Sequence, residues 1–433
     1  MAQIRAFKGV RYNQAVVGDL SKVVAPPYDV ISPEEQVRYH EQHPNNVVRL
    51  ILPMEDSTLE SKYTRAASCL SDWLGEGVLV QDPESCLYAY EQEFAVRGEW
   101  KRRLGFTCVV KLEDYESGTV LPHENTLAKP REDRLKLMRA ARANLDSVFG
   151  LFPEGKVNTI LRQFTALNPD AVATDKDGVK SRLWRISDPD AISAITETLA
   201  NESIVIADGH HRYAAALAYR NEMRGRGGDD PEAPFEYVMM TLVSLEDSGL
   251  VIFPTHRVVR GVLTFEPNSF ITKLSELFDM KMTTSDRLLE SVEALGSMNH
   301  VFGLHMKGGK SYVLKLKSSV SPERVIGTPG SDALKRLDVS VLHSLILEKL
   351  LGIGMKQLAS QSNLSYTRDV PAALKSVDAG ENQMVFLVNP TRVSEVRAVA
   401  AAGDKMPQKS TFFYPKLLTG IVMRAMPRLV ASR

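Results

Sequence analysis

The chain has 433 residues, enough for two or three domains with sizeable cores. Lysine plus arginine and aspartate plus glutamate each number 53, so the formal net charge is zero, and neither nucleic acid nor an acidic membrane is expected as a partner. Three cysteines at irregular spacing do not make a disulfide framework or a zinc ribbon, which favours a reduced, cytoplasmic setting. No stretch approaches the roughly 18 uninterrupted apolar residues of a membrane helix.

The first half of the chain mixes amphipathic helices with short strands. Ser32-Pro33-Glu34-Glu35 is typical of a helix start, with an N-cap residue, proline at the first helical position and acidic side chains in the first turn. Periodicity predicts helices over 33–43, 58–78, 131–143, 156–168 and 188–200, and strands over 86–96, 102–112 and 180–186. The first two strands are close enough in sequence to form an antiparallel pair.

The most informative stretch runs from Ile204 to Ala218. A β-branched apolar run ends at Asp208-Gly209, and an alanine-rich helix pattern begins within two residues. A strand, a tight turn and a helix start present backbone N–H groups and the positive end of a helix dipole to an anion. The plain structural alternative is that Asp208 caps the helix while His210 and His211 are solvated.

The second half contains a compact α+β stretch at 265–325 with no notable polar cluster. We predict helices over 268–278, 285–297 and 338–352, and strands over 237–245, 250–253, 279–283, 300–306, 311–316 and 384–388. The helix at 338–352 is expected to end at its glycine.

Four polar clusters are candidates for a functional site. They lie at 25–32, 121–126, 208–213 and 406–416. Glu124 lies in a loop rather than on a charged helix face, which suits an acid/base role, although many loop carboxylates are simply solvated. Lys409-Ser410-Thr411 offers one charge and two hydroxyls to an anion; alternatively it is a strand edge beside a buried aromatic run.

The nine histidines raise the question of a metal site. His123, Glu124, His210 and His211 could supply zinc ligands, but adjacent histidines suit one tetrahedral ion poorly, and neither HExxH nor CxxC occurs. His256 and His343 lie on or beside apolar segments, which favours hydrogen-bonded core histidines.

Five segments together make the sequence resemble the family of domain of unknown function 1015. They are APPYDVIS at 25–32, LPHEN at 121–125, DGHHRYAAAL at 208–217, FPTHRV at 253–258 and MPQKSTFFYPK at 406–416. That family is similar to the archaeal free serine kinases of the ParB/sulfiredoxin superfamily. His123-Glu124 resembles their catalytic loop, and DGHHR matches in full. Pro407-Gln408-Lys409-Ser410-Thr411 resembles their substrate-binding PKTT segment, with Gln408 inserted after the proline.

The resemblance implies an α+β fold with a ParB/sulfiredoxin-like catalytic core, N-terminal elaboration and an inserted α+β subdomain. Its expected division is 1–260 for the N-terminal elements and core, 265–325 for the accessory subdomain, and 330–433 for the part that completes the active site. The implied activity is transfer of a phosphoryl group from ATP or ADP, with Mg²⁺, to free L-serine or a similar small hydroxylated metabolite.

In this interpretation each cluster has a role. Glu124 is the general base, and Asp208 is catalytic and a candidate Mg²⁺ ligand. The nucleotide phosphates are assigned to Gly209, His210, His211 and Arg212, and the substrate to His123, Lys409, Ser410 and Thr411. Two alternatives remain: a nucleotide-binding switch like the CTP-dependent clamps of the same superfamily, and a metal-dependent hydrolase. The sequence carries no prediction of oligomeric state.

Overall fold

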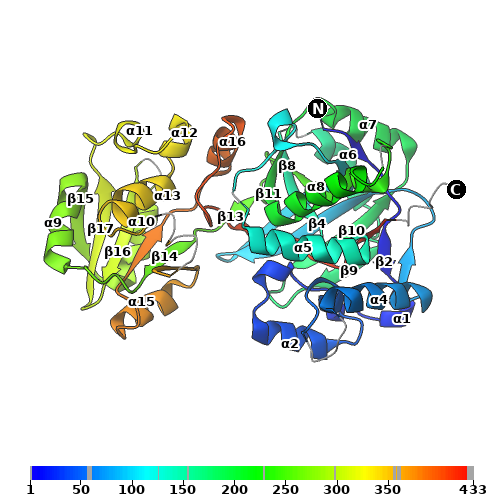
Figure 1. Ribbon diagram of the computed structural model, residues 1–433, viewed down its shortest axis with the longest axis horizontal. Coiled ribbons are helices and arrows are strands. Elements are labelled where there is room, and N and C mark those ends of the chain that lie inside the picture. Colours follow the sequence, from blue (N-terminus) through cyan, green and yellow to red (C-terminus); the bar gives the residue numbers. More distant parts are fainter. Residues whose placement is uncertain are drawn as a thin grey trace. The chain divides into compact units, whose positions relative to one another are not determined.

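The computed structural model of the chain describes residues 2–55, 61–124, 126–153, 156–227, 230–296, 299–354, 357 and 362–426 (Figure 1). The chain forms two compact units. Unit 1 comprises Met1–Pro122, Thr126–Leu250 and Pro415–Arg433, and unit 2 comprises His123–Asn125 and Val251–Tyr414. The chain therefore passes from one unit to the other several times.

A mixed sheet forms the centre of unit 1. Its strands are β1 (Ile4–Arg5), β4 (Leu87–Val96), β5 (Glu99–Lys111), β6 (Val120–Leu121), β8 (Val148–Phe152), β9 (Ala171–Thr174), β10 (Lys180–Ile186), β11 (Ile204–Asp208) and β12 (Tyr237–Ser244). Eight of them follow the order β6-β11-β8-β12-β5-β4-β10-β9, and β1 pairs with β5. The β11–β6 and β12–β8 pairs are parallel, while the predicted β4–β5 pair is antiparallel.

One face of this sheet is apolar and carries three helices. They are α6 (Lys156–Thr165), α7 (Pro189–Leu199) and α8 (His210–Arg224). Their inward residues, among them Leu161, Ile195 and Tyr213, share one buried cluster with Phe106 and Met240 of the strands. Burial of this apolar surface is the main stabilising contribution to the unit.

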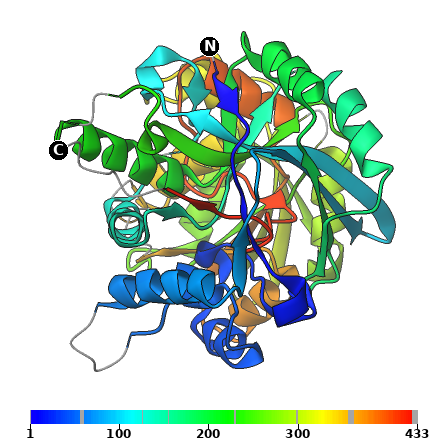
Figure 2. The same cartoon turned by 90° about the vertical axis from the view of Figure 1, so that its right-hand side faces the viewer.

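The opposite face of the sheet holds buried polar side chains that bind the C-terminal segment, which is dark red in Figure 2. Arg103 is 2% exposed, donates hydrogen bonds to Gln92 and, at 2.6 Å, to the Pro415 carbonyl, and lies over the Phe149 ring. Gln92 in turn donates to the Lys416 carbonyl at 2.9 Å. Burial lowers the Arg103 pKa to about 10. These bonds tie residues 415–416 to the sheet.

The N-terminal residues and a further helix complete unit 1. The elements are β2 (Val10–Tyr12), α1 (Gln14–Val17), α2 (Pro33–Gln42), α3 (Val48–Ile51), α4 (Lys62–Gly75), β3 (Leu79–Gln81), α5 (Ala128–Ala141), β7 (Ala143–Asn144) and β21 (Arg424–Ala425). Ser32 and Glu35 form the capping box of α2, as predicted. Helix α5 packs between α4 and α8.

Unit 2 has its own six-stranded sheet in the part of it that the structure describes. The strands are β14 (His256–Val259), β15 (Phe278–Thr283), β16 (Val301–Met306), β17 (Lys310–Leu316), β18 (Leu364–Thr367) and β19 (Met384–Val388), in the order β15-β17-β16-β19-β14-β18. Its helices are α9 (Pro267–Leu277), α10 (Ser285–Leu295), α11 (Pro322–Val325), α12 (Asp332–Lys335), α13 (Asp338–Val341), α15 (Val370–Asp378) and α16 (Val393–Ala401). The segment 265–325 thus contributes three strands to a sheet that it shares with flanking segments.

Most predicted elements occur within two to four residues of their expected limits, with differences that have local causes. The helix expected at 338–352 begins as α13, continues as a π-helical segment over Leu342–Glu348, and ends before Gly352, which has φ 68°. Strands β9, β14 and β18 are too short to show alternation in the sequence. Residues 58–60 and 297 of the predicted helices lie outside the described residues.

The chain is therefore a mixed α+β protein with a large mixed sheet. Among the residues that the structure describes, no helix is both long and apolar enough to cross a membrane.

Arg103 provides a test of the polar face. We expect Arg103→Met to lower the free energy of unfolding by about 3 kcal/mol, because the Pro415 carbonyl and the Gln92 side chain lose a buried donor. Arg102→Met is the matched control, since its side chain is 67% exposed, and it should change stability by less than about 0.5 kcal/mol. Urea denaturation measures both, and equal losses would contradict the anchoring role.

Candidate functional site

The junction between β11 and α8 is a strand–turn–helix corner, as the sequence predicts. Gly209 is the first residue outside α8 and has φ 89°, a left-handed conformation that favours glycine. A Cβ atom at this position would lie 2.9 Å from Nε and 3.0 Å from Cζ of Arg212. Two independent features therefore favour glycine at position 209: the left-handed backbone conformation and the close approach of the Arg212 guanidinium.

Asp208 binds two cations at this corner. One carboxylate oxygen accepts a hydrogen bond from Nη2 of Arg212 at 2.5 Å, and the other pairs with Nζ of Lys416. Burial alone would raise the Asp208 pKa, but Lys416 and Arg212 outweigh it and hold the pKa well below its usual range. Asp208 is thus a carboxylate that organises two positive side chains, and it is not the side-chain cap of α8.

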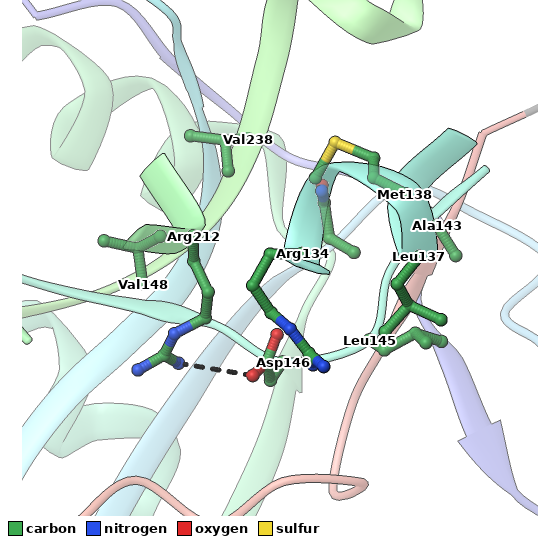
Figure 3. A pocket seen from close by; sticks show the side chains of 10 residues that line it. Arg134, Leu137, Met138, Ala143, Leu145, Asp146, Val148, Arg212 and Val238 are labelled. Carbon is green, nitrogen blue, oxygen red and sulfur yellow. Dashed lines mark ion pairs between the residues drawn. The ribbon is translucent and has the colours of Figure 1, made fainter. Parts of the chain in front are cut away.

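Arg212 is held from several sides and is 5% exposed. Its Nη1 donates to the Ser147 carbonyl and lies 3.7 Å from Oδ2 of Asp146 (Figure 3). Burial lowers the pKa of Arg212, but Asp146, Asp208 and Asp29 raise it by more, so the guanidinium stays charged. Two of its nitrogens bind protein oxygens, so Arg212 contributes its positive charge to the corner and holds Asp208 in place.

Behind Arg212 lies a small cavity of about 30 Å³, lined by Arg134, Asp146 and Arg212 together with apolar side chains (Figure 3). That volume corresponds to about one water molecule. Burial raises the pKa of Asp146, and the nearby arginines oppose this shift. Arg134 also lies over the Tyr28 ring at 3.9 Å, which brings the segment 25–32 to this cluster.

The two histidines after Gly209 are not simply solvated. His210 is 5% exposed, and it adds a smaller contribution to the lowering of the Asp208 pKa. Nε2 of His211 accepts a hydrogen bond from the Leu127 N–H at 3.0 Å, which makes Nε2 the unprotonated nitrogen. The hypothesis of two solvated histidines is therefore wrong.

Unit 2 gathers a second group of predicted site residues. Glu124 and Met406 form an isolated parallel β-bridge, in which the Met406 N–H donates a hydrogen bond to the His123 carbonyl at 2.7 Å. One oxygen of Glu124 accepts the Lys409 N–H at 2.5 Å, while Nε2 of His123 shares a 3.0 Å hydrogen bond with the Thr411 hydroxyl. The loop with the candidate base and the segment with the candidate anion-binding residues therefore meet, as the family resemblance implies.

Arg257 fixes the backbone of this group from the other side. It is fully buried and donates to the Lys409 carbonyl at 3.2 Å, to the Thr255 carbonyl and to Nε2 of His343 at 3.3 Å. Burial lowers its pKa to about 10. Lys409 adopts φ 57°, a left-handed conformation uncommon for lysine, and its N–H and C=O are each held by a charged side chain.

His256 and His343 are core histidines, as predicted. His256 is 2% exposed, and its Nδ1 accepts the Val388 N–H at 3.2 Å. Burial lowers the pKa of His256 to about 4 and that of His343 well below its usual value, so both are neutral near pH 7. A neutral His343 is what allows Nε2 to accept from Arg257.

The aromatic run after Thr411 is partly structural. Phe413 and Tyr414 form β20, which pairs with β13 (Val251–Ile252), and Phe413 is 1% exposed. Ser410 is also buried, and its carbonyl accepts from Thr391 at 2.8 Å. Lys409 is the exposed residue of the three predicted there. The core interpretation of 406–416 therefore holds for Ser410 and Phe413, and the anion-binding interpretation stays a prediction for Lys409.

The five segments of the resemblance fall into two groups. Segments 25–32 and 208–217 meet with Lys416 in unit 1, and residues 123–124, 253–258 and 406–414 meet in unit 2. The sequence interpretation missed Lys416, Asp146 and Arg257 as site residues. Lys416 and Arg257 lie within two of the five segments that carry the family resemblance, so the sequence did offer a reason to consider them. Asp146 lies outside these segments.

The residues around Asp208 do not fit the predicted Mg²⁺. Both of its oxygens bind cationic side chains, and two positive charges at that range oppose a divalent ion. The described residues contain no group of three histidine, cysteine, aspartate or glutamate side chains placed to hold a metal. The contacts of Asp208 therefore do not support its predicted role as a Mg²⁺ ligand.

Fold and site together define a mixed α+β protein whose large sheet presents a charged helix start. The chain belongs to the family described as protein of unknown function DUF1015, whose model matches residues 4–340. The sequence matches no curated protein.

Several solved structures are loosely similar. A conserved hypothetical protein from Pyrococcus furiosus is 15% identical, with 71% of this chain and 90% of that chain covered and a TM-score of 0.34. A free serine kinase in complex with AMP is 14% identical, with 71% of this chain and 86% of the kinase chain covered and a TM-score of 0.34. C-terminally truncated SbnI from Staphylococcus aureus is 12% identical, covers 72% and 85%, and has a TM-score of 0.35.

Gly209 tests the corner. Gly209→Ala should destabilise the protein by about 2 to 3 kcal/mol, because the left-handed backbone costs about 1 kcal/mol and the new Cβ must displace the Arg212 guanidinium. Gly178→Ala is the matched control, since Gly178 has φ 78° and open space around the added atom. Denaturant unfolding compares the two. An equal loss in both would show that the contact with Arg212 is unimportant.

Proposed function

We propose that this chain is a nucleotide-dependent kinase that phosphorylates free L-serine or a similar small hydroxylated metabolite. The observation that carries the proposal is the corner at Asp208, where one buried carboxylate orients Arg212 and Lys416 beside the start of a 15-residue helix. Phosphoryl transfer requires positioning and charge neutralisation more than covalent chemistry by the enzyme, and this corner supplies both.

Unit 1 is assigned to the phosphoryl donor, ATP or ADP. The start of α8, at Gly209, His210 and His211, is assigned to the phosphate oxygens, because the positive end of a helix dipole attracts anions. Lys416 adds a positive charge, and at about 4 Å one charge pair contributes about 4 kcal/mol at an effective dielectric constant near 20. Asp208 keeps Lys416 and Arg212 in place, so its own role is to position these cations.

Unit 2 is assigned to the acceptor. Glu124 takes the proton from the serine hydroxyl as the hydroxyl oxygen bonds to the terminal phosphorus and the bridging oxygen leaves with the shortened nucleotide. The hydrogen bond from the Lys409 N–H orients the Glu124 carboxylate. The side chains of Lys409 and Thr411 would bind the phosphoryl group, and His123 holds Thr411 through its hydroxyl.

The direct test incubates purified protein with Mg²⁺, ATP or ADP, and serine, threonine or related hydroxylated metabolites, and detects phosphorylated products by mass spectrometry. Product with any of these acceptors supports the kinase. Nucleotide hydrolysis that ignores every acceptor supports a nucleotide switch instead, and no turnover with any donor contradicts the proposal.

Replacing Glu124 tests the proton transfer. Glu124→Gln should lower kcat by about 10²- to 10⁴-fold, because the amide cannot take the hydroxyl proton, while nucleotide affinity stays unchanged. Glu290→Gln, an exposed change on α10, is the control and should retain full activity. Steady-state kinetics with calorimetric nucleotide binding separates the two effects. A Glu124→Gln protein with normal kcat would remove Glu124 from the mechanism.

Replacing Lys416 tests the phosphate site. Lys416→Met should weaken nucleotide binding by about 10- to 100-fold, since one charge contact with phosphate is lost and Asp208 loses a partner. The exposed Lys310→Met is the control. Calorimetry with ATP and with adenosine distinguishes a phosphate contact from general damage, because adenosine binding should not change. Equal weakening for both ligands would refute the assignment.

A further inference from the structure

Strand β15 is one of the two edge strands of the unit 2 sheet and pairs with β17 (Figure 1). Its residues Asp279, Lys281 and Met282 are exposed, and Met282 is 67% exposed. A hollow of about 1,050 Å³ runs beside Asp279 and Lys281, between β15 and α10. Helix α10 packs on β16 and β17, so it leaves the β15 side of this face uncovered.

The backbone direction of β15 follows from its pairing. The Lys317 N–H donates to the Leu277 carbonyl, so residue 277 directs its polar groups toward β17. In an antiparallel pair the backbone N–H and C=O groups of successive residues point alternately toward and away from the partner strand. The backbone groups of Asp279, Lys281 and Thr283 therefore also point toward β17. The N–H and C=O groups of Met280 and Met282 therefore point away from the sheet, toward whatever lies beyond its edge.

We propose that β15 is a dimerisation edge, at which a second copy of this chain adds its own β15 in antiparallel orientation about a two-fold axis at Met280. In this register Met280 faces Met280 of the other copy, and the two residues exchange their outward hydrogen bonds. Met282 faces Phe278 and extends the apolar face of the sheet. Asp279 faces Lys281, so the symmetric arrangement forms two ion pairs.

The charges select this register over its neighbours. Registers with hydrogen-bonded partners differ by steps of two residues, because only the even-numbered residues of β15 face outward. Centring the axis on Lys281 would place two lysines opposite each other, and centring it on Asp279 would oppose two carboxylates. With the axis at Met280, which lies between these two positions, each Asp279 faces a Lys281 of the other copy. Both repulsions are thereby replaced by attractions.

A lysine on an edge strand commonly prevents strand addition. Here Asp279 stands two residues from Lys281 on the same face of the strand, so a second copy can compensate the charge while a foreign strand without a matching acidic residue cannot. The Asp-Met-Lys pattern is therefore self-complementary. This inference rests on unit 2 alone and is independent of the proposed kinase activity.

The experiment measures the mass of the full-length protein by sedimentation equilibrium over a range of concentrations. We expect the wild type to pass from one chain to two as concentration rises. Asp279→Lys and Lys281→Asp should each raise the dimer dissociation constant about tenfold or more, because like charges then face each other across the strands. An equimolar mixture of the two variants should recover dimers, since each carries the charge that the other needs.

Two further variants keep the result interpretable. Arg287→Glu changes a charge in the same hollow but on α10, and should leave the dissociation constant unchanged. Met280→Pro removes an outward N–H and should abolish dimers; circular dichroism confirms that the variant is folded. A wild type that stays monomeric at every concentration overturns the proposal. So does a dimer that all these variants leave intact, or a mixture that fails to recover association.

Discussion

The arrangement of unit 1 around its candidate site depends on a single carboxylate, Asp208, whose side chain is only 14% exposed. Asp208 ends β11, and its two oxygens bind Arg212 from the following helix and Lys416 from the C-terminal segment. A carboxylate buried without partners would be protonated, and two buried cations without a carboxylate would repel each other. The three groups are therefore stable only together. Gly209 and the anchoring of residues 415–416 by Arg103 both serve to bring them together.

Charged side chains also hold a turn in unit 2, where the central residue is Lys409 and the groups that bind its backbone are a guanidinium and a carboxylate. There a buried guanidinium, Arg257, binds the carbonyl of Lys409, while the carboxylate of Glu124 binds its N–H. Lys409 is thereby kept in a left-handed conformation that it would rarely adopt alone. In both units a backbone turn of the candidate site is stabilised by charged side chains from distant segments, so the fold itself positions these residues.

Local sequence patterns predicted most of the secondary structure correctly. The capping box at Ser32, the strand–turn–helix corner at Asp208 and the helices and strands between 267 and 316 each rest on short-range signals. Strands such as β14 and β18 were missed because four residues are too few to show a period. The neutral core histidines 256 and 343 were predictable, since an imidazole inside an apolar run must be hydrogen-bonded.

What the sequence by itself determined was the position of the chemistry: the motif segments, the turn that needs glycine at 209, and the family to which the chain belongs. Only the tertiary structure decided which segments share a site. It paired Asp208 with Lys416 across 208 positions of the chain and Glu124 with Lys409 across 285. The reason is physical: local propensity depends on near neighbours, whereas a buried charge is tolerated only where the whole fold supplies its partner.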